Sequence, residues 1–245
     1  VIARFTLVLI LFGCPTSGRA QDFVLHGYVD VRVASAADEQ SWVNGGIGKT
    51  RYGDGGIGAH FGGAAVVATW QFAPEWLALA DVRYQSQDDS TVSVTEAFVR
   101  YRPVSTSAWR WSLRAGEFFV PISLENEGIG WTSLWTLTPS AIDSWVGEEL
   151  RAFGGEFRIE HRGETNTLEA AVALVGRNDP AGEILASRGW SLDDIVSGAG
   201  SRLREPDVYA TLVGVQPPRR YDPFLEIDNR VGAYADLTWR STPFG

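Results

Sequence analysis

The chain has 245 residues, of which 44% are hydrophobic, and carries a formal net charge of −9 with a pI of about 4.9. This acidic balance argues against nucleic-acid binding, which needs a basic surface. A mean hydropathy of −0.07 excludes a bundle of transmembrane helices but not a β-barrel, whose interior face is polar. His26, His60 and His161 lie far apart and the one cysteine is Cys14, so we expect no metal site and no cofactor.

Residues 1–20 have the pattern of a secretory signal peptide. Arg4 gives a positive start, residues 5–12 form an apolar core, and residues 18–20 form a small-x-small cleavage site. A lipoprotein signal that is acylated on Cys14 is the alternative. Either signal exports the chain from the cytoplasm, and cleavage after Ala20 leaves residues 21–245 as the expected mature domain.

Stretches in which apolar and polar residues alternate follow one another along the rest of the chain. A period of two places successive side chains on opposite faces of a strand. The stretches are long enough to cross a bilayer, since a tilted strand needs about 9–11 residues. The expected strands are residues 23–33, 58–72, 76–85, 92–102, 109–119, 150–160, 167–177 and 225–239.

The connections between these strands alternate between long and short, as in outer-membrane barrels with short periplasmic turns and long outer loops. The short connections are residues 73–75, 103–108 and 161–166. Aromatic residues flank them and would form an interfacial girdle: Trp70, Phe72, Trp76, Tyr101, Trp109, Trp111 and Trp239. We therefore predict an all-β fold, a transmembrane antiparallel up-and-down β-barrel with about eight strands in this chain.

Charged residues of both signs fall on the strand face that would look into the barrel. The expected pore-lining residues are Arg83, Glu96, Arg100, Arg110, Arg114, Glu156, Arg158, Asp228 and Arg230. Arg100, Arg110 and Arg114 fall on neighbouring strands, which predicts an arginine patch on one wall. Alternatively, the inward charges pair across strands and fill a small barrel.

The third long connection, residues 121–149, is apolar for a loop, and its charged residues are all acidic. We expect it to fold into the barrel as a constriction loop, because a large apolar surface favours burial. Acids would face the arginines and tryptophans would hold the loop against the wall: Glu125, Glu127, Asp143, Trp131, Trp135 and Trp145. A lid on the barrel rim or a subunit contact is the alternative.

Several segments resemble the phosphate-selective porins (porin O/P-like) of Gram-negative outer membranes. They are SWVNGGIGK (41–49), RAGEFFVP (114–121), TPSAIDSW (138–145) and NDPAG (178–182). The resemblance covers most of residues 23–240 and implies a channel of about 16 strands, often a homotrimer, whose third loop constricts the pore. The chain is then expected to be an N-terminal fragment of such a porin.

The expected function is passive diffusion of small polar or ionic solutes through a charged pore in the outer membrane of a Gram-negative bacterium. Expected partners are outer-membrane lipid, the solutes and further copies of the chain. Two alternatives stay open: a small closed barrel with a structural or adhesive surface role, and a lipid-modifying enzyme. Catalysis is not expected, because the sequence has no Gly-x-Ser-x-Gly element to supply a nucleophile.

Overall fold

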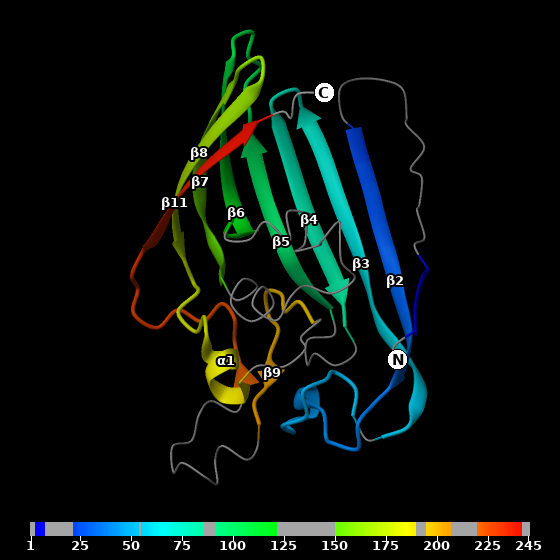
Figure 1. The fold of residues 1–245 in the computed structure, drawn as a ribbon. Coiled ribbons are helices and arrows are strands. Elements are labelled where there is room, and N and C mark those ends of the chain that lie inside the picture. The colour runs from blue at the N-terminus through cyan, green and yellow to red at the C-terminus, as the bar shows by residue number, and fades with distance from the viewer. Residues whose placement is uncertain are drawn as a thin grey trace.

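The computed structural model describes residues 3–7, 22–53, 55–85, 92–121, 150–189, 195–206 and 220–241. Its main feature is one antiparallel sheet that bends from its first to its last strands and does not close on itself (Figure 1). The strand order is β1-β2-β3-β4-β5-β6-β7-β8-β11. Each long strand therefore pairs with the next one along the chain, which is the topology of a meander.

The strands of this sheet are Ala3–Leu7 (β1), Asp22–Ser35 (β2), Ile57–Ala73 (β3), Trp76–Tyr84 (β4), Val92–Tyr101 (β5), Trp109–Phe119 (β6), Arg151–Arg162 (β7), Asn166–Gly176 (β8) and Gly232–Ser241 (β11). Smaller elements lie in the long connections: the 3-10 helix Trp42–Asn44 (η1), the helix Glu183–Arg188 (α1), and the paired strands Leu203–Arg204 (β9) and Arg220–Tyr221 (β10). Among the described residues, no helix is both long enough and apolar enough to span a membrane.

The all-β, antiparallel, up-and-down arrangement expected from the alternating pattern is confirmed. The last strand differs from the expectation, because it begins at Gly232 rather than at residue 225. Asn229 has a φ of 54°, and the Asp228 carboxylate accepts a hydrogen bond of 2.9 Å from the Arg230 N–H. These are features of a local turn, in which Asn and Asp are favoured over strand residues.

The two ends of the sheet do not meet. Among the described strands, β11 pairs only with β8, and β2 carries β1 along part of its other side. These strands therefore do not form the small closed barrel that the sequence left open. The backbone of β1 comes from the segment expected to be a signal peptide, and removal of residues 1–20 stays a prediction.

Short connections lie at one end of the sheet and long ones at the other, as the sequence predicts. The turn Pro74–Glu75 joins β3 to β4, residues 102–108 join β5 to β6, and residues 163–165 join β7 to β8. Local hydrogen bonds close them, such as Gly163 N–H to Asn166 O at 2.8 Å. The other connections leave the sheet at the opposite end of the strands, at residues 36, 85, 120 and 177.

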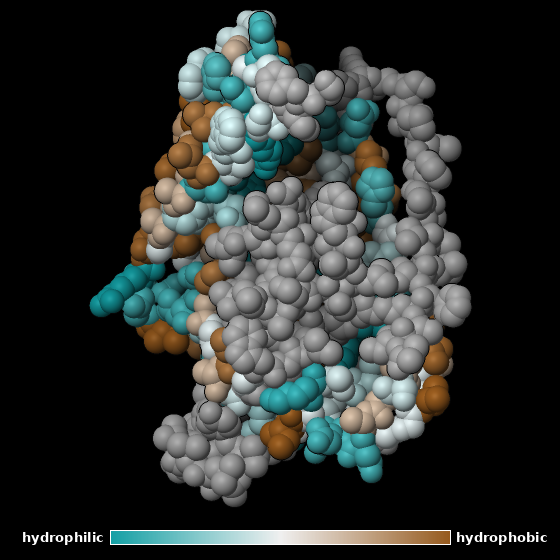
Figure 2. Space-filling view, viewed as in Figure 1, coloured by the Kyte–Doolittle hydropathy of each residue, from teal (hydrophilic) through white to brown (hydrophobic). Residues whose placement is uncertain are grey.

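The two faces of the sheet differ in polarity. One face, the apolar face, carries large hydrophobic side chains that are exposed. They include Leu25, Val31, Val66, Trp76, Val99, Leu113, Phe157, Val172, Leu174, Leu237 and Trp239. The other face, the charged face, carries the acidic and basic strand residues. Figure 2 shows apolar side chains along the border of the molecule where β8 and β11 run.

Aromatic rings form a continuous belt beside the short turns. The ring centroids of Trp76 and Tyr101 lie 4.8 Å apart, and those of Tyr101 and Trp111 lie 5.6 Å apart. The belt continues from Trp111 to Phe157 at 6.2 Å. Phe72 extends it in the other direction, 6.1 Å from Trp76. The aromatic clustering expected from the sequence is therefore present over β3 to β7.

A separate hydrophobic core holds the long connections together. Its buried members come from η1, α1, β9, β10 and the chain before β9: Trp42, Val43, Ile184, Ile195, Leu203 and Tyr221. In Figure 1, α1 and β9 lie beyond the lower ends of the long strands. This core therefore positions the connections over one end of the sheet.

Candidate functional site

The charged face of β6, β7 and β8 carries a network of ion pairs. Arg114 and Glu156 occupy paired positions on β6 and β7, and Arg114 Nη2 lies 2.8 Å from Glu156 Oε2. Arg158 bonds the same carboxylate at 3.2 Å and also pairs with Glu169 on β8. The Tyr234 hydroxyl on β11 donates to Glu156 as well. The Glu156 side chain is only 4% exposed, so these donors replace its contact with water.

A cluster of arginines lies beside this network, toward the short turns. Arg100 on β5 stands opposite Arg114 on β6. Arg110 on β6 stands opposite Glu160 on β7, and Arg102 pairs with Glu160 at 3.4 Å. Arg100, Arg102, Arg110 and Glu160 line a cavity of about 160 Å³, together with Arg158 and Glu169.

The arginines of this cavity outnumber the carboxylates. Its lining includes four arginines, Arg100, Arg102, Arg110 and Arg158, against Glu160 and Glu169. Among the described residues, no salt bridge is formed by Arg100 or Arg110. The Arg110 Nε is also buried without a hydrogen-bond partner. This part of the charged face therefore presents a surplus of positive charge to a small cavity.

A second buried pair lies on β4. Arg83 and Asp81 bond each other at 3.0 Å, with side chains 7% and 0% exposed. Asp81 stands opposite Glu96 on β5, whose side chain is also buried. Charged residues that follow each other at i and i+2 are on one face of a strand, which explains the local pairing.

The structure brings most of the expected pore-lining residues together on one face. They are Arg83, Glu96, Arg100, Arg110, Arg114, Glu156 and Arg158, on β4 to β7. Asp228 and Arg230 do not join them, because the strand that was expected to hold them begins at Gly232. These two side chains pair with each other at 3.3 Å and are 44% and 85% exposed. They lie in the connection before β11.

The expected constriction loop lies outside the described residues. This applies to each of its predicted residues: Glu125, Glu127, Asp143, Trp131, Trp135 and Trp145. Their inward placement therefore stays a prediction.

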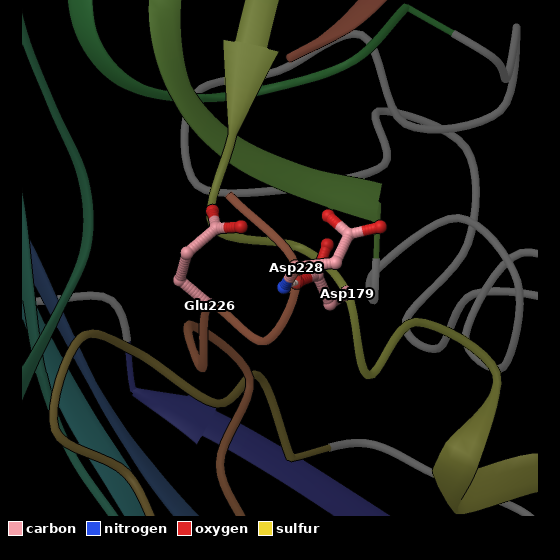
Figure 3. Close-up of side chains that lie close together, drawn as sticks. All are labelled: Asp179, Glu226 and Asp228. Atoms are coloured by element: carbon pink, nitrogen blue, oxygen red, sulfur yellow. Dashed lines mark hydrogen bonds between the residues drawn. The ribbon is translucent and has the colours of Figure 1, made fainter. Parts of the chain in front are cut away.

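Sequence reasoning did not single out a group of three acids at the end of the sheet with the long connections (Figure 3). One carboxylate oxygen from each of Asp179, Glu226 and Asp228 lies within 4.8 Å of the others. Asp179 already accepts hydrogen bonds from the backbone N–H groups of Ile227 at 2.5 Å and Asp228 at 3.2 Å. These bonds, the Ile227 bond foremost, lower the pKa of Asp179 below its usual range. These hydrogen bonds therefore join the start of the connection between β8 and β11 to its end.

A wide groove on the apolar face was also not predicted. Its volume is about 900 Å³, and it extends from β4 to β11. Side chains of the apolar face line most of it, including Trp76, Leu113, Phe157, Val172 and Leu174. Arg114, Glu156 and Tyr234 also contribute to its lining, but most of the groove surface is apolar.

Comparisons with known proteins add no relative: no protein-family model, no curated protein and no solved structure matches the chain. The resemblance to phosphate-selective porins therefore stays a prediction.

Proposed function

We propose that this sheet is part of the wall of a transmembrane β-barrel in the outer membrane of a Gram-negative bacterium. Its apolar face would contact lipid, and its charged face would line an aqueous pore for passive diffusion of small polar or ionic solutes. The observation that carries the proposal is the polarity of the two faces. An antiparallel sheet in a water-soluble protein turns its polar face to solvent and buries its apolar face. Here the side chains left uncovered are the apolar ones, Leu174, Leu237 and Trp239 among them.

Strand length supports the same proposal. Strands β2 to β8 and β11 have between 9 and 17 residues. A tilted membrane-spanning strand needs about 9–11 residues, whereas strands of soluble proteins typically have about 5–6. The aromatic belt beside the short turns lies where a membrane–water interface would place Trp and Tyr.

The charged face supports a pore rather than a structural or adhesive surface role. Arg100, Arg110 and their neighbours give one wall a surplus of positive charge, whereas Glu156 and Glu169 neutralise the arginines next to them. Fixed charges on the wall of a pore attract solutes of opposite sign and steer their passage. The pore would therefore favour anions at the height of the arginine cluster.

An open sheet cannot by itself be a complete pore. Unpaired backbone groups in lipid cost several kcal/mol each, so membrane strands must close into a barrel. The free side of β11 would therefore pair with further strands, from the same polypeptide or from another copy. A larger porin-like barrel that assembles as a homotrimer is the arrangement we propose.

Lipid contact by the apolar face can be measured through its tryptophans. The protein would be refolded into vesicles whose acyl chains carry bromine atoms, which quench tryptophan fluorescence on contact. We expect strong quenching from exposed Trp109 and Trp239, which are 54% and 66% exposed in the structure. Trp42 is buried in the core of the connections and would serve as the internal control, tested in variants that keep one tryptophan. If Trp239 were protected from quenching as fully as Trp42, the proposal would be overturned. Flux of small ions from the same vesicles would then test the pore.

A further inference from the structure

A short segment after α1 lies against the sheet at the end with the long connections. Residues 195–201 come from the connection between β8 and β11, far from β4 in the sequence. Gln85, which follows β4, nevertheless bonds this segment twice. Its Nε2 donates to the Val196 carbonyl at 2.6 Å, and its Oε1 accepts from the Val196 N–H at 3.2 Å.

The neighbouring strand β5 holds the same segment through the backbone. The Ala199 N–H donates to the Val94 carbonyl at 2.6 Å, and the two residues form an isolated antiparallel bridge. Gly198 lies so close to β5 that an added Cβ would collide with the Val94 carbonyl and come within 2.6 Å of the Ser93 side chain. A glycine is therefore required where the segment touches the wall.

Strands β6 and β7 complete the contact. Arg151, at the start of β7, is 1% exposed, and its Nη2 donates to the Ser197 hydroxyl at 3.1 Å. Its Nη1 reaches the Thr95 carbonyl at 3.3 Å, so one side chain ties the segment to β5 as well. Phe119, at the end of β6, packs against Val196. Residues 196–199 thus contact three consecutive strands, β5 to β7, and Gln85 at the end of β4.

The segment is anchored on its other side by the core of the connections. Ile195 is fully buried there with Trp42, Leu203 and Tyr221. Ser201 closes the segment by accepting a hydrogen bond of 2.8 Å from the Gly198 N–H. A segment held by hydrogen bonds to the wall and by apolar packing at its base has little freedom to move.

We propose that residues 195–201 form a fixed constriction at the mouth of the pore on the side of the long connections. This inference rests on the proposed pore function. The segment reads Ile-Val-Ser-Gly-Ala-Gly-Ser and carries no charged side chain. It therefore restricts solutes by size, while the arginine cluster near the short turns selects by charge.

The contact between the segment and the wall can be tested independently of conduction. Val94 and Ala199 are bridge partners, so their Cα atoms are about 5 Å apart, a separation that a disulfide spans. In a Cys14→Ser background, the Val94→Cys/Ala199→Cys pair should form a disulfide in the refolded protein. The control pair Val94→Cys/Ala186→Cys, with the second cysteine on α1, should stay reduced. Failure of the first pair to oxidise would overturn the proposal.

The constriction itself is tested by releasing the segment. Gln85→Ala removes both bonds to Val196. We expect vesicles with this variant to admit uncharged sugars that the unmodified protein excludes, with an unchanged reversal potential. Gln71→Ala, which removes a bond to the Pro74 carbonyl in a short turn, is the matched control and should keep the original size limit. A folded Gln85→Ala protein with the original size limit would overturn the constriction. Absence of flux in every protein would instead overturn the pore, and the disulfide would still report the position of the segment.

Discussion

Arg114 and Glu156 stand opposite each other on β6 and β7 and form a hydrogen-bonded ion pair of 2.8 Å on the charged face. The guanidinium of Arg114 also lies over the ring of Phe118, 4.1 Å from its centroid. Glu156 receives further bonds from Arg158 and Tyr234. One carboxylate therefore joins β6, β7 and β11, although β7 and β8 lie between β6 and β11 in the sheet.

Glu156→Gln should destabilise the protein, because it leaves Arg114 and Arg158 without their shared charge. Breaking a buried pair by removing one partner costs about 3 kcal/mol or more. Urea unfolding in detergent would measure the change in the free energy of unfolding. Glu164→Gln, in the exposed turn between β7 and β8, is the control and should change stability by less than about 0.5 kcal/mol. Similar values for the two variants would show that the network is not a stabilising feature.

Replacing Arg100 and Arg110 with alanine should shift the selectivity of the proposed pore toward cations. These side chains supply positive charge that the described carboxylates do not neutralise through salt bridges. Reversal potentials across a planar bilayer measure the shift, which should shrink in strong salt because the Debye length falls to about 3 Å at 1 M. Arg230→Ala changes an exposed arginine in a connection and is the control. Equal reversal potentials for the double variant and the unmodified protein would contradict the charge surplus.

Gly116→Ala should disrupt the pairing of β5 with β6. Gly116 has a φ of 139°, and a Cβ there would collide with the Ala97 carbonyl. Backbone strain of this kind costs about 1–3 kcal/mol before the collision is counted. Gly155→Ala, on β7, is the control, since its Cβ would lie 3.8 Å from the Arg114 carbonyl oxygen. Thermal unfolding would compare them, and a fully stable Gly116→Ala protein would show that the strand irregularity is dispensable.

The hydrogen bonds that the Asp179 carboxylate accepts from backbone N–H groups should be lost in acid but not in base. Its bonds to Ile227 and Asp228 lower the pKa of the carboxyl, so their contribution is present above the unfolded pKa. It is lost as the pH falls through the lower folded pKa. Hydrogen exchange of the Ile227 and Asp228 amides, corrected for intrinsic rates, should therefore stay slow in mild acid and accelerate only in strong acid. In the Asp179→Asn variant, the corrected exchange rates of the two amides should not change with pH. If these rates still rose in acid, another group would be responsible for the pH dependence.

The sequence predicts the strands well because alternation is a local property. Along β6, exposed Trp109, Trp111 and Leu113 alternate with Arg110 and Arg114, and this pattern sets the strand and its faces. The predicted start of the last strand at residue 225 was wrong. Apolar and polar residues also alternate over 225–231, but Asp228 and Asn229 form a turn there instead.

Contacts between distant segments could not be predicted in the same way. Register shifts occur at Asp30/Val31 in β2 and at Asp81/Val82 in β4. Such bulges displace every later cross-strand partner in the strand pair that contains them. Strands β6 and β7 pair without a shift, but a long connection joins them, so the pairing of Arg114 with Glu156 is set by the folded sheet. The contact of segment 195–201 with the sheet was not predicted, because the segment is short and uncharged. Its small residues at Gly198 and Ala199 were the available signal, since close backbone approach requires them.

The apolar face also constrains how the protein reaches its destination. A folded sheet with Leu174, Leu237 and Trp239 uncovered would self-associate in water. Among the described strands β11 pairs with β8 alone, so the backbone groups on its other side can pair with another chain. For the proposed location in an outer membrane, the chain would therefore have to cross water unfolded and fold only on contact with lipid. Folding yield in vitro should accordingly depend on the order of addition, being high when denatured protein meets detergent or vesicles before the denaturant is diluted.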